Sequence, residues 1–372
     1  MEVQRLARLR AAMKAAGLRA VFITNPKNVR YFTGVRALMG ESVQPFGDPE
    51  YFVLATAERC DVLCDGRYFS GIKGLPGITP QLMDSPTTAD VIGRKIRDLI
   101  GGRHEAVGFE QDFVIYRDAI ELFKTVPEFE WRSADMLLSR LREIKTPAEC
   151  ELIRQAQAIT CEAFNHIAGF IQVGMTEHQV AMEIEDYIRE RSEGNSFHPI
   201  VAFGATGAHA HYAPSPTRKL EKGQMVLLDF GAIYQGYCGD LTRMICMGKA
   251  DARQREVYDL VLQAQMACLA AVRPGVTTGA LDAVCRDFFA SKGCAEHFIH
   301  GTGHGVGLAI HEAPRLKKGI ETLVESGMAF TVEPGLYYEG WGGVRIEDLV
   351  IATETGCENV TKAGKALVEL EA

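Results

Sequence analysis

Five side chains in the C-terminal part of this 372-residue chain are of the types that bind metal ions. They are Asp229, Asp240, His304, Glu333 and Glu347. Four carboxylates and one neutral imidazole carry a formal charge of −4, which two divalent cations would neutralise. Oxygen-rich sites with a single nitrogen ligand suit Mn²⁺, Co²⁺ or Zn²⁺. Because two such ions can share a water and make it a hydroxide at neutral pH, this set predicts a hydrolase.

The two aspartates fall in a predicted β-hairpin. A turn centred on Tyr234-Gln235 would place Asp229 directly opposite Asp240, with Cβ atoms about 4.5–5.5 Å apart. That separation would let the pair chelate one ion. Neither turn residue is Gly or Asn, the residues that tight hairpins favour, and a longer loop would shift this register. Solvated turn residues are the alternative, but each aspartate sits in an apolar run where an unpaired carboxylate is costly.

The two glutamates also fall in strand-like segments. Glu333 continues the face of Ala329 and Thr331, and Glu347 shares a face with Arg345, because strand side chains alternate. A structural salt bridge between Arg345 and Glu347 is the alternative for the second segment. Four acids embedded in apolar strands, together with a glycine-flanked histidine, favour metal binding over that alternative.

Four glycines surround that histidine, at positions 301, 303, 305 and 307. A nucleotide-binding loop would need a third glycine in the G-x-G-x-x-G spacing, which this segment lacks. We expect instead that these glycines let the backbone pass close to the metal ions.

The second half of the chain resembles the pita-bread metallopeptidases, in particular the proline-specific Xaa-Pro aminopeptidases and Xaa-Pro dipeptidases. The matching segments cover residues 141–350 and are LREIKTPAECELIRQA, VLLDFGAIYQGYCGDLTR, HGTGHGVGLAIHEAP, MAFTVEPGLY and GGVRIEDLV. The resemblance implies an α+β fold. In that fold a pita-bread catalytic domain over residues 136–372, with an internal pseudo-twofold repeat, follows a smaller creatinase-like α/β domain over residues 1–135.

The resemblance also implies roles for individual residues. The five ligands named above would bind two divalent ions, Mn²⁺ first, with Co²⁺ or Zn²⁺ as alternatives. His211 and His311 would lie beside the metals and contact the substrate or the tetrahedral intermediate, while His300 and Arg345 would occupy supporting positions. We therefore expect catalytic roles for His211, His311, Glu333 and Arg345, and substrate binding by His211, His300 and His311.

The reaction implied is hydrolysis of the bond between an N-terminal residue and a following proline. A hydroxide bridging the two ions would attack the carbonyl, and Glu333 would carry its proton to the leaving nitrogen. We expect an Xaa-Pro aminopeptidase acting on peptides with proline in second position, with an Xaa-Pro dipeptidase (prolidase) as the alternative. A methionine aminopeptidase would lack the N-terminal domain. A creatinase-like hydrolase or a non-enzymatic binding module is more remote, because all five ligands are retained.

Composition limits the classes of partner. A net charge of −8 gives no reason to expect nucleic-acid binding. No apolar stretch is long enough for a transmembrane helix, and the first 18 residues predict an amphipathic surface helix rather than a secretory signal. Ten cysteines without C-x-x-C spacing indicate reduced thiols. We expect a cytoplasmic protein that does not bind membranes, and the family resemblance implies a homodimer.

The N-terminal domain is predicted to be a sheet with helices. Strand-like runs over residues 19–24, 51–56 and 61–65 precede a helical pattern over residues 87–100. The two domains join near Thr146-Pro147-Ala148-Glu149, which supplies an N-cap, a proline in the first turn and a capping-box glutamate. These signals predict that a long helix begins there.

A faint repeat follows in the second half. Gly174-Met175-Thr176 and Gly275-Val276-Thr277 each come after a long helical segment that contains Gln-Ala-Gln. Each copy predicts the order helix, G-x-T cap, helix and strand. Helix starts of this kind are common, so a chance match is the alternative.

Overall fold

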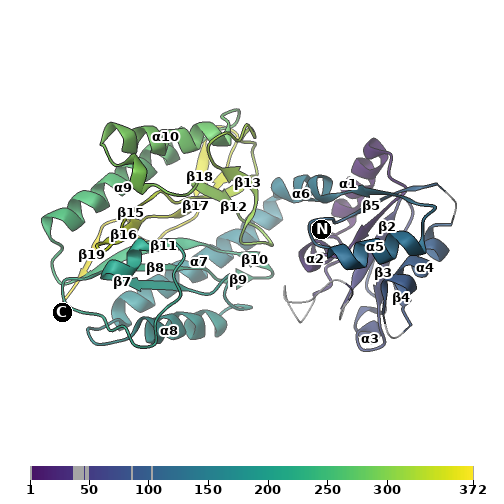
Figure 1. Cartoon of the computed structure of the whole chain (residues 1–372), viewed down its shortest axis with the longest axis horizontal. Coiled ribbons are helices and arrows are strands. Elements are labelled where there is room, and N and C mark those ends of the chain that lie inside the picture. Colours follow the sequence, from purple (N-terminus) through teal and green to yellow (C-terminus); the bar gives the residue numbers. More distant parts are fainter. Residues whose placement is uncertain (1, 37–45, 47–49, 85–86, 102–103, 372) are drawn as a thin grey trace. The chain divides into compact units, whose positions relative to one another are not determined.

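The computed structural model describes residues 2–36, 46, 50–84, 87–101 and 104–371, which fall into two compact units, Met1–Arg142 and Glu143–Ala372 (Figure 1). The last helix of the first unit, α6, spans Asp135–Glu143. The domain boundary expected at 135/136 therefore coincides with the start of α6, and the two units divide at its end.

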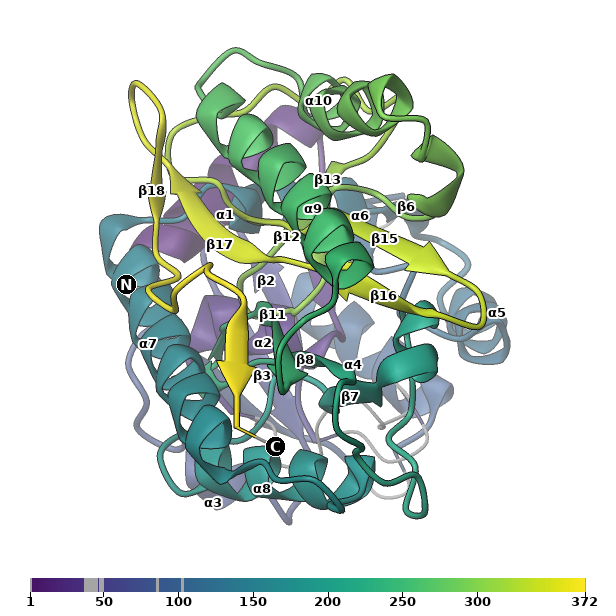
Figure 2. The same cartoon turned by 90° about the vertical axis from the view of Figure 1, so that its left-hand side faces the viewer.

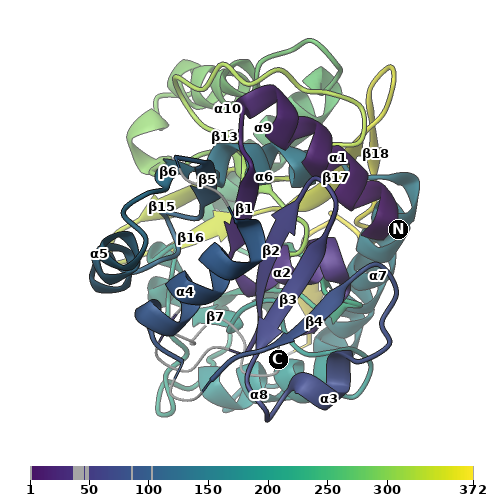
Figure 3. The same ribbon diagram turned by 90° about the vertical axis from the view of Figure 1, so that its right-hand side faces the viewer.

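The first unit is a six-stranded mixed sheet with helices (Figure 3). The strand order is β4-β3-β2-β1-β5-β6. β1 pairs antiparallel with β2 and parallel with β5. The elements are α1 (Glu2–Ala16), β1 (Ala20–Ile23), α2 (Pro26–Thr33), β2 (Phe52–Thr56), β3 (Cys60–Cys64), α3 (Phe69–Ile72), β4 (Thr79–Leu82), α4 (Ala89–Ile100), β5 (Ala106–Phe109), α5 (Tyr116–Thr125), β6 (Glu130–Ser133) and α6.

Burial in this unit follows the apolar pattern of the sequence. Helices α4 and α5 pack Ile92, Ile96 and Leu122 against the sheet face of Phe22 and Leu54. The N-terminal helix is amphipathic as predicted, because α1 buries Leu6, Leu9 and Met13 while most of its other residues are exposed or half-buried. The three predicted strands and the predicted helix over 87–100 are all present.

The second unit carries two larger sheets and two short hairpins. The larger sheets have the orders β19-β11-β8-β7 and β13-β12-β14-β17-β18. The elements are α7 (Pro147–Phe170), α8 (Glu177–Arg189), β7 (Ile200–Phe203), η2 (Gly204–Ala208), β8 (Met225–Phe230), β9 (Ile233–Tyr234), β10 (Tyr237–Cys238), β11 (Leu241–Met247), α9 (Ala252–Ala271), α10 (Thr278–Ser291), η3 (Ala295–His297), β12 (Gly303–Gly305), β13 (Glu312–Leu316), β14 (Ala329–Val332), β15 (Gly335–Tyr338), β16 (Gly342–Arg345), β17 (Asp348–Ala352), β18 (Cys357–Asn359) and β19 (Val368–Leu370).

The predicted capping residues stand at the starts of helices α7, α8 and α10. Thr146 and Glu149 form the predicted capping box at the start of α7. In both copies of the repeat the threonine caps the following helix, Thr176 for α8 and Thr277 for α10. The order long helix, cap, helix and strand therefore recurs, as the sequence predicts.

Helices enclose the strands of this unit from two sides. α7 and α8 lie along one side and α9 and α10 along the other (Figure 2). Strand β8 reaches both layers: Met225 and Leu227 join the core that contains α9 and α10, while Val226 and Leu228 join the core of α7 and α8. The side chains of this strand therefore alternate between the two cores, and the end of β8 lies between the two halves.

The hairpin turn differs from the prediction by one residue. Tyr234 pairs with Tyr237, so the turn is Gln235-Gly236 rather than Tyr234-Gln235. Both turn residues have positive φ, 46° for Gln235 and 88° for Gly236. A two-residue turn of type I′ needs this conformation at both positions and favours glycine at the second.

The shifted turn overturns the predicted pairing of the aspartates. Asp229 lies opposite Thr242, not Asp240. Asp240 falls in the irregular link just before β11, beside a very close backbone approach: a Cβ on Gly231 would lie 1.8 Å from the carbonyl oxygen of Gly239. Position 231 must therefore be glycine, because any side chain there would collide with the backbone at Gly239.

In the described part of the chain, no helix has the length and apolar character needed to cross a bilayer. All ten cysteines are free thiols, nine of them buried.

Candidate metal centre

The five predicted ligands lie at or beside strand ends of the two sheets of the second unit. Asp229 is near the end of β8 and Asp240 just before β11, in one sheet. In the other sheet, His304 lies on β12, Glu333 just after β14 and Glu347 just before β17. All five residues line one cavity of about 970 Å³, although Asp229 and Glu347 are 118 positions apart in the chain.

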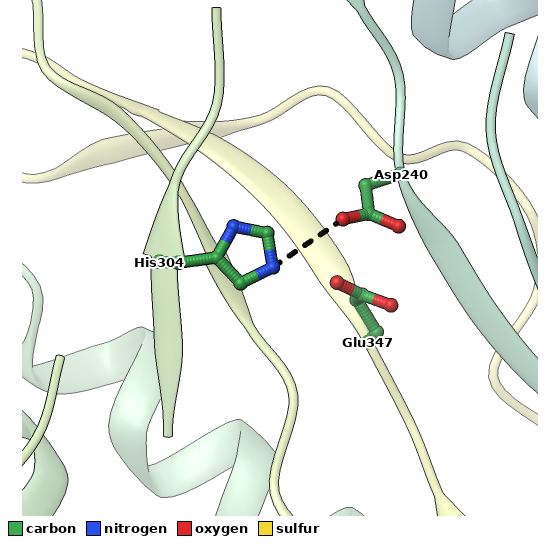
Figure 4. A group of neighbouring side chains, drawn as sticks. All are labelled: Asp240, His304 and Glu347. Carbon is green, nitrogen blue, oxygen red and sulfur yellow. Dashed lines mark ion pairs between the residues drawn. The ribbon is translucent and has the colours of Figure 1, made fainter. Parts of the chain in front are cut away.

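Three of these residues form a compact buried group. One ligand atom each from Asp240, His304 and Glu347 lies within 4.8 Å of the others, and the three side chains point toward one another (Figure 4). The His304 Nε2 atom is 3.5 Å from Asp240 Oδ2 and 3.3 Å from Glu333 Oε1. Glu333 is the most accessible of this set, with a side chain that is 16% exposed.

The neighbours of Glu333 and Glu347 match the predicted faces. Thr331 Oγ1 lies 3.1 Å from Glu333 Oε1, so these two residues share a face. Thr242, the residue opposite Asp229, donates to Glu347 Oε2 at 2.7 Å and accepts from Arg345 Nε at 3.1 Å. The Arg345 guanidinium forms its salt bridge with Asp229, so the alternative prediction of a salt bridge between Arg345 and Glu347 is wrong.

His304 presents a lone pair to the carboxylates. Its Nδ1 lies 3.2 Å from the Gly305 carbonyl oxygen, which can only accept, so Nδ1 carries the proton. Burial lowers the pKa of His304 to about 3, and the neighbouring His311 adds to this shift. The imidazole is therefore neutral at pH 7, and its unprotonated Nε2 faces the oxygens of Asp240 and Glu333.

Burial and mutual repulsion oppose ionisation of the acids. Burial raises the pKa of Asp240 well above its ordinary value, and the charges of Glu347, Asp229 and Glu333 raise it further. Burial, with Glu333 and Asp229 adding to it, raises the pKa of Glu347 in the same way. Burial raises the pKa of Glu333 to about 7. These carboxylates would ionise together only if a positive charge entered the site.

Two divalent ions fit this set of residues. Asp229 Oδ1 and Glu347 Oε1 are buried and have no hydrogen-bond partner among the described residues. A buried acceptor without a partner is costly, and a cation would satisfy both oxygens as well as the lone pair of His304. Oxygen-rich coordination with one imidazole suits hard or borderline divalent ions.

A buried hydrogen-bonded chain supports Asp229. The Arg345 guanidinium binds Asp229 Oδ2 and donates to the Tyr337 hydroxyl at 2.7 Å. Tyr337 lies 2.8 Å from His300 Nε2, and His300 Nδ1 lies 2.7 Å from the Gly301 carbonyl oxygen. Nδ1 therefore donates to Gly301, and Nε2 accepts from Tyr337. Burial lowers the pKa of His300 to about 4, so the ring is neutral.

His300 is thus placed differently from His211 and His311. Both of its ring nitrogens are engaged within the protein, although the residue borders the cavity. His211 and His311 border the same cavity and are exposed. The ring centroid of His311 lies 4.3 Å from that of His304. The geometry therefore suits His300 to positioning Arg345, and the two exposed histidines to contacting a substrate.

The segment that carries His211 is anchored by a buried acid. Glu177, at the start of α8, accepts the Ser215 N–H at 3.0 Å and the Phe203 N–H at 2.9 Å. It also accepts the Thr206 hydroxyl at 2.7 Å. These contacts fix both ends of the segment from 203 to 215 and thereby the approach of His211 to the cavity.

Sequence reasoning missed two residues of the cavity wall and two that support the site behind it. Arg315 and Lys317, on and just after β13, add two cationic side chains to its wall. Tyr337 links His300 to Arg345, and Thr242 links Glu347 to Arg345. Only Thr242 carried a signal, because a turn at Gln235-Gly236 places it opposite a predicted ligand.

The raised pKa values predict that the stability of the metal-free protein falls as pH rises, whereas its affinity for metal ions increases. A carboxyl group whose pKa is raised on folding contributes stability that is complete below its unfolded pKa and is lost as pH rises through the folded value. For Glu333 this window runs from its ordinary value of 4.5 to about 7. Asp240 and Glu347, whose pKa values are raised well above their ordinary values, act in the same direction. The lowered pKa values of His300 and His304 act in the opposite direction, but only below their ordinary value of 6.5. We therefore expect the metal-free protein to melt at a lower temperature at about pH 8 than at about pH 6.5.

Metal affinity should change in the other direction, because binding displaces protons and so strengthens as pH rises. Calorimetric titration in two buffers of different ionisation enthalpy would measure the released protons. The Glu347→Ala variant is the control for the melting experiment, since removing one acid should reduce the pH effect. Metal-free protein that is equally stable at both pH values would contradict this account of the cluster.

Comparisons with known proteins agree with this architecture. Residues 151–354 match Metallopeptidase family M24, and residues 5–144 match the Creatinase/Prolidase N-terminal domain. The chain is 33% identical to the Xaa-Pro dipeptidase of Pyrococcus furiosus over 367 residues, which cover 98% of this chain and 99% of that protein.

Two solved structures extend the likeness to the fold. A structure titled as an Xaa-Pro dipeptidase from Bacillus anthracis is 36% identical, with a TM-score of 0.90 and 100% of both chains covered. A structure titled as an X-Pro aminopeptidase from Thermotoga maritima is 30% identical, with a TM-score of 0.87, and the match covers 98% of this chain and 99% of that one.

The expected fold, an α+β chain with a creatinase-like N-terminal domain ahead of a pita-bread domain, is therefore confirmed. The M24 match covers more than half of the chain, and the chain holds an acid-rich cluster suited to divalent ions. This chain therefore belongs to the M24 metallopeptidases.

Proposed function

We propose that this protein is an Xaa-Pro dipeptidase that uses two divalent metal ions held by Asp229, Asp240, His304, Glu333 and Glu347. The observation that carries the proposal is the buried acid cluster opening on a cavity with cationic side chains in its wall. The relatives named dipeptidase match at 36% and 33% identity, against 30% for the X-Pro aminopeptidase. Other matched proteins also carry dipeptidase or prolidase names. These names favour an Xaa-Pro dipeptidase, the alternative in the sequence analysis, over the Xaa-Pro aminopeptidase that the sequence led us to expect.

Two bound divalent ions would activate a water at neutral pH and polarise the scissile carbonyl. Glu333 is the member of the cluster best placed to move the proton, because its side chain is the most accessible. A carboxylate at this position would take the proton of the attacking water and give it to the proline nitrogen. The C–N bond then breaks with a neutral amine as leaving group.

His211 and His311 would donate hydrogen bonds to the carbonyl oxygen as negative charge develops on it. Both residues border the cavity and are exposed to it, which suits this role. Arg345 would act indirectly, because its guanidinium is bound to Asp229 and to the Tyr337 hydroxyl. We assign Arg345, Tyr337 and His300 to holding Asp229 in place.

A dipeptide brings a free carboxylate close to the scissile bond, and Arg315 and Lys317 offer the matching charge. Arg315 is exposed on β13 in the cavity wall. Within the described part of the chain its guanidinium has no hydrogen-bond partner, so its donors are available for a substrate. A guanidinium binds a carboxylate with two parallel hydrogen bonds, which favours Arg315 over Lys317 as the principal contact.

Replacing Arg315 with Gln should therefore lower kcat/KM for Ala-Pro by about 10–100-fold, chiefly through KM, because a hydrogen bond to a charged group contributes about 1.5–3 kcal/mol. Hydrolysis of Ala-Pro amide, which lacks the carboxylate, should be unchanged. Lys318→Gln is the matched control, since Lys318 is exposed nearby but does not border the cavity. Equal losses on Ala-Pro and its amide would remove the carboxylate role.

A matched set of Ala-Pro, Ala-Pro-Ala and Ala-Ala-Ala tests the specificity directly. We expect cleavage of Ala-Pro, much slower cleavage of Ala-Pro-Ala and none of Ala-Ala-Ala. The X-Pro aminopeptidase likeness makes that activity the second candidate, and efficient cleavage of Ala-Pro-Ala would favour it. Cleavage of Ala-Ala-Ala at the rate of Ala-Pro would contradict proline specificity altogether.

Several further assignments belong to the proposal. We infer Mn²⁺ as the native metal, with Co²⁺ or Zn²⁺ as alternatives, and elemental analysis of purified protein would test this. Ten free cysteines support a reducing, cytoplasmic location. The homodimer implied by the family resemblance would be tested by light scattering. We also propose that residues 136–372 hold the whole catalytic site, since all the residues assigned above lie there.

A further inference from the structure

We propose that two buried glutamines, Gln157 on α7 and Gln265 on α9, are positioning residues that hold the backbone of the metal ligands Asp240 and Glu333. This inference rests on the proposed metal centre. It assigns a purpose to the Gln-Ala-Gln sequence that occurs once in each long helix of the internal repeat.

The two glutamines of each motif have opposite surroundings. Gln155 and Gln263, the first members, are exposed, whereas Gln157 and Gln265 are both 0% exposed. Successive residues in a helix are about 100° apart, so positions two apart point to different sides. Burying an amide side chain is costly unless its hydrogen bonds are made. The hydrogen-bond partners of Gln157 and Gln265 therefore indicate why each of these buried positions is a glutamine.

Gln157 binds both backbone groups of Asp240. Its Oε1 accepts the Asp240 N–H at 2.8 Å, and its Nε2 donates to the Asp240 carbonyl oxygen at 2.8 Å. The same Nε2 donates to Thr361 Oγ1 at 2.8 Å. Asp240 lies in the link between β10 and β11, outside both strands. Gln157 thus supplies the donor and the acceptor that a neighbouring strand would otherwise provide.

A glycine makes this contact possible. A Cβ on Gly239 would lie 2.6 Å from Thr160 Oγ1 and 2.9 Å from the Ala156 carbonyl oxygen, so the link runs directly against α7. Any larger residue at 239 would push Asp240 away from the helix. With its backbone held by Gln157, Asp240 points its carboxylate toward His304 and Glu347 (Figure 4).

Gln265 makes the corresponding but weaker contact in the second half. Its Nε2 donates to the Val332 carbonyl oxygen at 3.5 Å, directly before Glu333. Its Oε1 accepts from Lys365 Nζ at 3.0 Å. The Glu333 N–H is already bound to the Thr302 carbonyl oxygen at 2.8 Å. Glu333 is therefore held by Thr302, just before β12, as well, and we expect it to depend less on its glutamine than Asp240 does.

The experiment measures metal binding by full-length, metal-free protein. Gln157→Met keeps the size of the side chain but removes both hydrogen-bonding groups, and Gln155→Met is its matched control on the same helix. We expect Gln157→Met to bind Mn²⁺ about 10–100-fold more weakly by calorimetric titration, as is typical when a partner of a metal ligand is removed. Gln265→Met should lose less affinity, and Gln155→Met and Gln263→Met should bind as the wild type does.

The visible absorption spectrum of the Co²⁺-loaded protein supplies a readout that a general loss of stability would not change. A displaced Asp240 should alter the band positions in Gln157→Met and leave them unchanged in Gln155→Met. If Gln157→Met does not fold, Gln157→Glu tests the same contact. That variant keeps the acceptor for the Asp240 N–H but loses the donor to its carbonyl oxygen, so weaker Mn²⁺ binding is again expected.

Two negative results can be told apart. Wild-type protein that binds no Mn²⁺ would overturn the proposed metal centre and this inference with it. Wild-type protein that binds two ions, together with a folded Gln157→Met that has the same affinity and the same Co²⁺ spectrum, would overturn the positioning role alone.

Discussion

Replacing Glu347 with Ala should lower metal occupancy and reduce kcat/KM for Ala-Pro by at least ~10²-fold while leaving the fold intact. Glu347 is 1% exposed, and its Oε2 is fixed by the Thr242 hydroxyl. Its Oε1 has no hydrogen-bond partner among the described residues and lies in the acid cluster. Its removal leaves an ion without one of its anionic ligands. Glu333→Ala should have a comparable effect, since that residue would both bind metal and move the proton.

The fold should survive because burial and like charges raise the pKa of Glu347, so its ionised form is unfavourable without metal. The metal-free Glu347→Ala variant should therefore be at least as stable as the metal-free wild type at about pH 8. Glu354→Ala, at an exposed acid outside the cavity, is the matched control. Full activity in Glu347→Ala or in Glu333→Ala would remove the dinuclear assignment.

The second large effect is expected at the two exposed histidines of the cavity. His211→Ala and His311→Ala should retain both metal ions but lose kcat by on the order of 10²-fold or more, as is typical when a donor to the developing oxyanion is removed. Neither residue belongs to the buried group of Asp240, His304 and Glu347. The loss should appear in kcat more than in KM, because the charge on the oxygen develops only in the transition state.

His209→Ala supplies the control for this pair. His209 is exposed two residues before His211 but does not border the cavity. It should behave as the wild type in kcat, KM and metal content. Metal loss in His311→Ala would mean that His311, whose ring contacts that of His304, helps to bind an ion.

Regular elements were predictable because their signals are local. The capping box at Thr146 and the two G-x-T caps depend on residues close together in the chain, and each forms as expected. The strands beside Glu333 and Glu347 were predictable for the same reason, although both residues lie just outside β14 and β17 rather than within them.

The errors and omissions have a physical cause in turn chemistry and tertiary contact. The hairpin turn lies one residue further along the chain than predicted because Gly236 suits the second position of the turn, and the partner of Asp229 differs accordingly. The contact of Gln157 with Asp240 joins residues 83 positions apart. The pairing of Arg345 with Asp229 spans 116 positions. No periodicity in one sequence reports such contacts.

The position of metal ions in a crystal of the Mn²⁺-loaded protein tests the central claim most directly. Anomalous scattering locates manganese without reference to protein activity. The account predicts two peaks per chain, both within coordination distance of side chains from Asp229, Asp240, His304, Glu333 and Glu347. No peak among these residues, or peaks coordinated by other side chains, would contradict it.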